Sequence, residues 1–140
     1  MKNFLSISAL LALGMLLAAG CAAPGKRRPR PDGELAGSFW KPANAPLNIY
    51  IEFTGDGRMV GSTGNNRFFG PVAYAKGKRI RLGPLAATRN RGAEKYEEQF
   101  FARIDDTRGY VLDGDTLTLY NEDRQPLMRL IRLKPQAGKP

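Results

Sequence analysis

Hydrophobic and polar side chains alternate most regularly along residues 47–54. The apolar side chains at every second position are those of Leu47, Ile49, Ile51 and Phe53. Because successive side chains of a strand point to opposite faces of a sheet, this period of two predicts a half-buried β-strand. The Gly55-Asp56-Gly57 sequence that follows is typical of a hairpin turn, so residues 58–62 are expected to return as the next strand.

Shorter segments with strand-like patterns occur along the rest of the chain. We expect strands at residues 35–41, 71–76, 78–82, 108–112, 115–120 and 127–133. Trp40, the only tryptophan, is expected to anchor the core. In the last segment Arg129 and Arg132 are three residues apart, which also suits a helix, but the neighbouring strands favour a strand.

Residues 93–104 have helical periodicity instead. The apolar stripe at spacings of three and four consists of Ala93, Tyr96, Phe100 and Ile104. Glutamates near the start and Arg103 near the end suit the helix dipole. One helix among many short antiparallel strands predicts a mainly β fold, either a small antiparallel barrel or a strongly rolled sheet.

A glycine-rich segment, residues 61–70, separates a predicted strand that ends near Val60 from one that starts near Pro71. Glycine and asparagine tolerate positive φ angles, so we expect an irregular loop here. A phosphate-binding loop is excluded because no Gly-Lys-Ser/Thr sequence follows and no helix begins behind it.

The first twenty-one residues point to export. Residues 1–20 have the pattern of a secretory signal peptide, with Lys2 before a short apolar run that ends in small residues. The Ala-Ala-Gly before Cys21 resembles the lipobox of bacterial lipoproteins, which implies lipidation of Cys21, including palmitate. An ordinary signal peptide followed by an unrelated cysteine is the alternative. Because Ala22 rather than Asp follows, the resemblance implies an outer-membrane location facing the periplasm of a bacterial envelope.

Residues 21–34 are expected to form a flexible tether, because they combine proline, glycine and charge without a large apolar side chain beyond the cysteine. Their basic residues would lie near anionic membrane headgroups. A nucleic-acid-binding signal is the formal alternative, but it is incompatible with export. The folded domain is expected at residues 35–134 and a disordered tail at residues 135–140.

The formal net charge is +9, and the charges are segregated. Residues 57–93 contain no acid, whereas residues 94–123 are mainly acidic. Two such blocks predict a basic and an acidic face, unless the blocks interleave and cancel in the fold. Strand alternation sends Arg79 and Arg81 away from the core. We therefore expect Arg67, Arg79 and Arg81 to bind anions.

No catalytic or metal site is expected. The chain has no histidine and Cys21 is its only cysteine, so Ser-His, Cys-His and zinc-binding combinations cannot be assembled. The carboxylate pairs Asp105-Asp106 and Asp113 with Asp115 lie in turn-like sequence, and a hairpin explains the second pair better. We therefore expect neither an enzyme nor a cofactor.

Several short motifs, taken in order, resemble the META domain family, also called HslJ-like. They are Trp40, residues 53–58, residues 64–70, residues 85–89, a glutamate-rich helix ending in Phe100, and residues 110–119. The resemblance implies a small calycin-like antiparallel barrel with one helix. It also implies a bacterial protein that is exported or lipid-anchored and linked to heat stress and envelope integrity.

Two positions depart from the family pattern. The family usually has Gly-Cys-Asn where this chain has Gly64-Asn65-Asn66, and a second cysteine where Gly92 stands. Their joint loss is expected if the two cysteines act as a pair. The positions that still match the motif are Gly64, Asn66, Gly70, Thr88 and Arg89. We interpret them first as structural, with ligand binding as the alternative.

The sequence thus predicts a non-enzymatic envelope lipoprotein, anchored to the membrane through Cys21. We expect it to bind anionic envelope lipids or polymers and to support envelope integrity under stress, with no nucleic-acid partner. The alternative is an inhibitor of an envelope-directed hydrolase, such as a lysozyme or a protease. A basic lysozyme would be repelled by a domain as basic as this one, which weakens the alternative.

Overall fold

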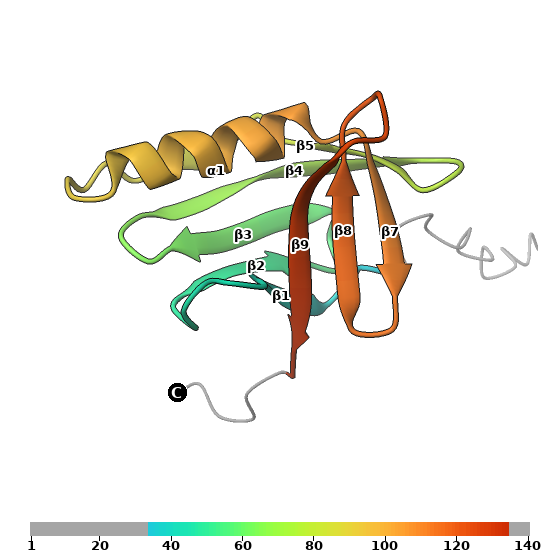
Figure 1. The fold of residues 1–140 in the computed structure, drawn as a ribbon, viewed down its shortest axis with the longest axis horizontal. Coiled ribbons are helices and arrows are strands. Elements are labelled where there is room, and N and C mark those ends of the chain that lie inside the picture. Colours follow the sequence, from blue (N-terminus) through green and yellow to red (C-terminus); the bar gives the residue numbers. More distant parts are fainter. Residues whose placement is uncertain (1–33, 135–140) are drawn as a thin grey trace, which may run out of the picture.

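The computed structural model describes residues 34–134. The predicted signal peptide, Cys21, nearly all of the tether and the tail lie outside the described residues. The elements, in chain order, are β1 Ser38–Pro42, β2 Ile49–Phe53, β3 Arg58–Thr63, β4 Arg67–Ala75, β5 Arg79–Leu82, β6 Ala86–Ala87, α1 Glu94–Asp106, β7 Gly109–Asp113, β8 Thr116–Tyr120 and β9 Pro126–Leu133 (Figure 1).

All strands belong to one nine-stranded antiparallel sheet that closes into a ring. The strand order is β3-β2-β1-β9-β8-β7-β5-β4-β6, and pairing of β3 with β4 closes the ring. The pairing of β5 with β7 is the shortest in the sheet, because it consists of a single register pair, Arg79↔Gly109. The predicted mainly β fold, a closed or strongly rolled antiparallel sheet with one helix, is confirmed.

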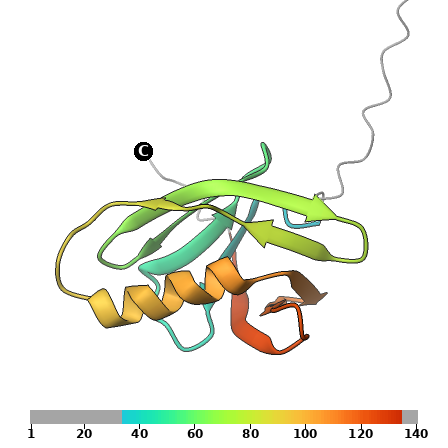
Figure 2. The ribbon, with the colours of Figure 1, turned by 90° about the horizontal axis from the view of Figure 1, so that it is seen from above.

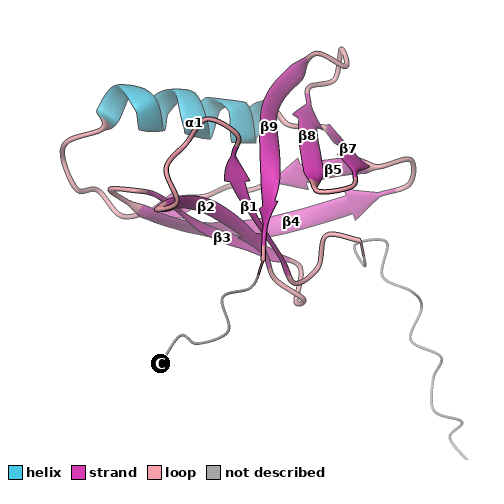
Figure 3. Cartoon of the chain, turned by 60° about the horizontal axis from the view of Figure 1, so that its bottom comes forward, coloured by secondary structure: helices cyan, strands magenta, loops and turns pink. Residues whose placement is uncertain are grey.

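Helix α1 lies at one side of the ring (Figures 2 and 3) and contacts β5. Phe100 and Ile104 of the helix are buried, and the Phe100 ring lies 5.4 Å from the ring of Phe68 on β4. Tyr96, which the apolar stripe placed in the core, is 40% exposed and stacks on the outer side of Phe100. The helix therefore contributes its second half to the core more than its first.

Trp40 is fully buried, as predicted, and its indole N–H donates to the Ser38 hydroxyl at 2.7 Å. Its strand begins three residues later than expected. Leu35 is buried in a turn instead, where its carbonyl accepts from the Ser38 N–H at 3.1 Å. Apolar character alone therefore did not distinguish a buried turn residue from a strand residue.

The predicted loop at residues 61–70 was too long, since only residues 64–66 connect β3 to β4. Gly61 is a buried strand residue: a Cβ there would lie 2.3 Å from the Tyr50 carbonyl oxygen and 2.4 Å from the Phe68 ring. The missing side chain lets the Phe68 ring lie across the strand. The glycine serves close packing rather than an irregular backbone.

Two further boundaries differ from the prediction. Leu47 is 70% exposed because β2 begins only at Ile49, after a turn in which the Ile49 N–H donates to the Pro46 carbonyl. The short strand β6 was not predicted, because its two alanines carry no alternating pattern. It pairs with Phe68 and Phe69 on β4.

Candidate functional site

Asn66 stands at the centre of a polar cluster in which Asn66 and Thr63 are buried. The Asn66 cluster consists of Thr63, Asn66, Thr88, Asn90 and Glu97. The side chain of Asn66 is only 3% exposed. Its Nδ2 donates to both carboxylate oxygens of Glu97, at 2.9 and 2.8 Å, and to the Asn90 carbonyl at 3.0 Å. Its Oδ1 accepts from the Thr88 hydroxyl at 2.8 Å and from the Asn90 N–H at 2.6 Å.

These bonds join three segments that are far apart in sequence. Thr63 ends β3 and its hydroxyl donates to the Glu97 carboxylate on the first turn of α1. The Thr88 hydroxyl, in the segment after β6, also accepts from the Arg67 N–H at 3.0 Å. Both polar atoms of the Asn66 side chain therefore have protein partners, and none is left to meet a ligand.

Asn65 makes a second connection between the same segments. Its Nδ2 donates to the Asn90 and Arg91 carbonyls at 2.9 and 3.1 Å. A Cβ built on Gly92 would lie 3.9 Å from that Nδ2. The two positions at which the resemblance implies cysteines are thus neighbours in space, and hydrogen bonds join Asn65 to the two residues before Gly92.

The remaining motif positions are not all drawn into the cluster. Gly64 has a φ of +90°, which favours glycine in the turn before Asn66. Gly70 lies farther along β4, where a Cβ would be 2.7 Å from the Pro84 carbonyl oxygen. Arg89 is exposed and makes no ion pair within residues 34–134. Of the predicted motif residues, Gly64, Asn66 and Thr88 are brought together.

Arginines follow the outer face of β4 from end to end. By register, Arg67 lies opposite Ser62, Arg58 opposite Pro71, Arg81 opposite Ala73 and Arg79 opposite Ala75. We call this set the arginine stripe; its members are Arg58, Arg67, Arg79 and Arg81. The outward positions of β3, β4 and β5 contain no acid. At about 3.3 Å per residue, the stripe extends over about 26 Å of strand.

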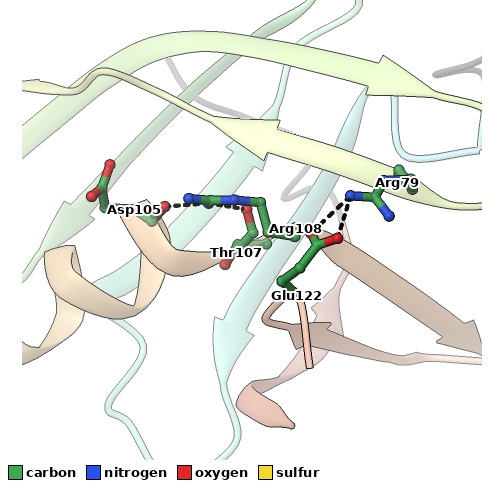
Figure 4. Close-up of polar contacts among 5 residues, drawn as sticks. All are labelled: Arg79, Asp105, Thr107, Arg108 and Glu122. Atoms are coloured by element: carbon green, nitrogen blue, oxygen red, sulfur yellow. Dashed lines mark hydrogen bonds and ion pairs between the residues drawn. The ribbon is translucent and has the colours of Figure 1, made fainter. Parts of the chain in front are cut away.

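The three arginines predicted to bind anions do not form one cluster. Arg67 lies at the opposite end of β4 from the register partners of Arg79 and Arg81. Arg79 is also paired with an acid, since its Nη2 donates to both carboxylate oxygens of Glu122 at 3.0 and 2.8 Å (Figure 4). The two charge blocks therefore interleave at this point. Within the described part of the chain, Arg67 and Arg81 make no ion pair.

Around the Arg79–Glu122 pair the ring is hollowed. A cavity of about 400 Å³ lies between the start of β5 and the β7–β8 hairpin. A second hollow of about 390 Å³ lies over β4 and β5, and Arg79, Arg108 and Glu122 line both. We call the first cavity the seam groove, because it lies where β5 and β7 share a single register pair.

In the lining of the seam groove, Tyr110 lies next to Lys78, which is paired with Glu34. The Lys78 ammonium is ion-paired with Glu34 and sits 5.5 Å from the centre of the Tyr110 ring. Burial raises the pKa of Tyr110 to about 12, and the negative charge of Glu34 adds to the shift. The hydrogen bond from Lys78 lowers the pKa of Glu34. These shifts describe an ion pair over an aromatic ring rather than a group poised for proton transfer near neutral pH.

Within residues 34–134, no three acidic or cysteine side chains gather to hold a metal ion. The same part of the chain has no helix long and apolar enough to cross a membrane.

A family model described as the META domain matches residues 34–132. The chain belongs to the META domain family. Membership rests on nearly the whole described fold and covers the Asn66 cluster and the arginine stripe. It is compatible with an envelope-associated, non-enzymatic protein. No curated protein matches this META domain chain.

Solved structures agree with the fold of this META domain. A DUF4847 family protein from Bacteroides vulgatus has a TM-score of 0.58 at 17% identity, covering 75% of this chain and 99% of its own. A protein from Burkholderia xenovorans has a TM-score of 0.54 at 17% identity, covering 96% of this chain and 99% of its own. At such low identity the likeness concerns the fold alone.

Sequence reasoning missed Glu97, Asn90 and Glu122 as contact residues. Glu97 was read only as a favourable charge near the start of the helix. No local pattern relates it to Asn66, which is thirty-one positions earlier. Glu122 belongs to the acidic block, and only the pairing of β5 with β7 brings it to Arg79.

Proposed function

We propose that this META domain is a non-enzymatic binding module whose arginine stripe associates with the anionic surface of a bacterial envelope membrane. The single observation that carries the proposal is the outer face of β3, β4 and β5, where arginines follow β4 and no acid occupies an outward position. Two acids border this face: Glu52 on β2, opposite Val60, and Glu122, which is paired with Arg79.

The composition of the stripe suits a membrane interface. Phe69 lies on the same face, is 49% exposed, and has the Arg58 guanidinium 5.5 Å from its ring centre. An aromatic side chain flanked by cations combines insertion at the headgroup level with attraction to anionic lipids. Each basic residue near such a surface contributes about 1 kcal/mol, so several arginines together give useful affinity.

The predicted anchor at Cys21 would strengthen this association. A lipid anchor holds the domain near the membrane through a short tether, which raises the effective concentration of headgroups around the stripe. Weak contacts of single arginines with headgroups are then enough to keep the stripe on the membrane surface. The anchor itself stays a prediction, as does the outer-membrane location.

In the same proposal the motif residues are structural. Gly64, Asn66 and Thr88 would fix the β3–β4 turn to the helix, while Gly70 would let residues 84–85 pack on β4. The support is the saturation of the Asn66 side chain by protein partners. A binding role for Asn66 would require those bonds to break first.

Vesicle sedimentation tests the membrane proposal directly. The Arg58→Glu, Arg81→Glu double variant should bind vesicles of anionic phospholipid at least roughly tenfold more weakly than the unchanged domain, since about 1 kcal/mol is lost for each basic residue. Arg79 is left unchanged because Glu122 already neutralises it. Binding should also weaken as salt rises.

The matched control reverses two exposed arginines outside the stripe, Arg91→Glu with Arg129→Glu. It has the same net charge as the test variant, so a purely global charge effect would weaken both equally. Equal losses in the two variants, or equal binding of the unchanged domain to neutral vesicles, would contradict the proposal.

A further inference from the structure

The seam groove has an unequal set of charges. Its lining includes the basic side chains Lys78, Arg79, Arg108 and Arg124, and Glu122 is its only acid. Lys78 is neutralised from outside the groove by Glu34. The groove therefore retains an excess of positive charge even with the Arg79–Glu122 pair formed.

Arg108 contributes its charge from a fixed position. Its Nη1 donates to the carbonyls of Asp105 and Thr107, at 2.6 and 2.9 Å, at the C-terminal end of the helix (Figure 4). Its guanidinium thus faces the helix end rather than Glu122. Arg108 adds positive electrostatic potential to the groove without contacting a ligand, while Arg79 and Arg124 are available to contact one directly.

The Arg79–Glu122 pair is poised for exchange. Both side chains are more than half exposed, at 57% and 61%. An ion pair with this exposure stabilises a fold by only about 0 to 1 kcal/mol. The turn that carries Glu122 is held by other bonds, since the Gln125 N–H donates to the Asn121 Oδ1 at 2.8 Å. Glu122 can therefore leave Arg79 while the turn keeps its shape.

We propose that the seam groove binds a phosphate monoester whose phosphoryl group replaces the Glu122 carboxylate on Arg79. Arg124, on the same turn as Glu122, is the second phosphate contact. The organic part of the ligand lies against Tyr120 and Val111, which form the apolar side of the groove. This site shares Arg79 with the arginine stripe but differs from the membrane proposal, because it requires one phosphoryl group and not a charged surface.

The competition with Glu122 selects the ligand class. Glu122 is a carboxylate held beside Arg79 at high effective concentration. A free monocarboxylate carries no more negative charge than Glu122, so it cannot displace Glu122 from Arg79. A phosphate monoester carries about −1.5 to −2 at pH 7 and three acceptor oxygens, which suit two arginines at once. Binding should therefore weaken below about pH 6, where the phosphate takes up a proton.

Isothermal titration of the soluble domain with phenyl phosphate tests the site, with phenol and benzoate as comparison ligands. Phenyl phosphate should bind, and phenol and benzoate should not. Glu122→Gln should bind phenyl phosphate at least fivefold more tightly, because the internal competitor is removed. Arg79→Gln should lose binding, and Arg124→Gln should weaken it several-fold.

The matched control is Asp123→Asn, which removes the same charge from the neighbouring residue outside the groove. If Asp123→Asn raises affinity as much as Glu122→Gln, the gain is a general charge effect and the exchange is wrong. No binding of phenyl phosphate to Glu122→Gln, with an unchanged melting temperature, would also overturn the proposal.

The two proposals fail separately. Loss of phenyl phosphate binding with vesicle binding intact rejects the groove alone, whereas the reverse result rejects the stripe alone. Titration with inorganic phosphate separates the phosphoryl group from its organic part: tighter binding of phenyl phosphate supports the contact with Tyr120 and Val111. Equal affinity for both would overturn that contact.

Discussion

The polar contacts at the two ends of helix α1 differ in burial and in whether their side chains are accessible to a ligand. Beside its first turn, Asn66 is buried and both of its side-chain polar atoms have protein partners. Near its last turn, Arg79 and Glu122 are exposed beside a hollow. The helix of thirteen residues separates the two places by roughly 20 Å.

This difference separates fold maintenance from recognition. A buried polar group that loses its partners costs free energy, so such groups are saturated in a stable fold. An exposed pair costs little to break, so its members can change partners. We therefore infer that the family motif around Asn66 holds the fold, and that the seam groove is where a ligand is met.

The largest expected effect comes from breaking the Asn66 cluster. Asn66→Ala should lower the free energy of unfolding by roughly 3 kcal/mol, at about 1 kcal/mol for each hydrogen bond. The half-buried Glu97 carboxylate, the Thr88 hydroxyl and the Asn90 N–H would each lose a partner. Urea unfolding followed by circular dichroism measures the loss. Asn65→Ala, the neighbouring and more exposed amide, should cost only about 1 kcal/mol. Equal costs would remove the distinction between the two asparagines.

A smaller effect is expected at the other end of the helix. A double-mutant cycle with Arg79→Gln and Glu122→Gln should give a coupling of less than about 1 kcal/mol in the free energy of unfolding, because the pair is exposed. In phenyl phosphate binding, the two variants should change the affinity in opposite directions: Glu122→Gln should raise it and Arg79→Gln should lower it. A coupling above about 2 kcal/mol would mean that the pair is structural, as Asn66 is.

The smallest effect concerns the pKa of Tyr110. The folded-state pKa is raised to about 12, so the stability linked to its neutral phenol is present below pH 10 and is lost as pH rises from 10 to 12. Glu34→Gln removes the nearby negative charge and should lower the pKa of Tyr110. Ultraviolet titration of tyrosinate measures the shift, with Tyr110→Phe identifying the signal. An unchanged pKa in Glu34→Gln would leave burial as its only cause.

Most of the strands were predictable because each carries its own signal. The alternation of Ile49, Ile51 and Phe53 depends on neighbours in sequence, as do the turns at Gly57 and Gly114. The extent of β3 was not predictable, since Gly61 looks like a loop residue until the Phe68 ring is placed over it. A glycine that allows close packing and a glycine that allows a turn are identical in sequence.

The site was predictable only in part, for a related reason. The outward direction of Arg79 and Arg81 follows from strand alternation and is confirmed by their exposure. The partner of Arg79 follows from the pairing of β5 with β7, which brings Glu122 to Arg79 across forty-three positions. The charge pattern along the chain therefore predicted the arginine stripe, whose members all come from the acid-free segment. It did not predict the seam groove, where the basic and acidic segments meet.

The pairing of β1 with β9 also decides when the domain can fold. Trp40 lies opposite Arg132, so one of the two neighbours of the first strand is the last strand. A chain emerging from the ribosome lacks that neighbour until Pro126–Leu133 has been made, and the core around Trp40 stays open to water until then. Such non-local closure delays folding to the end of synthesis. If the predicted signal peptide directs export, this delay keeps the chain unfolded, and so competent for translocation, until it has crossed the membrane.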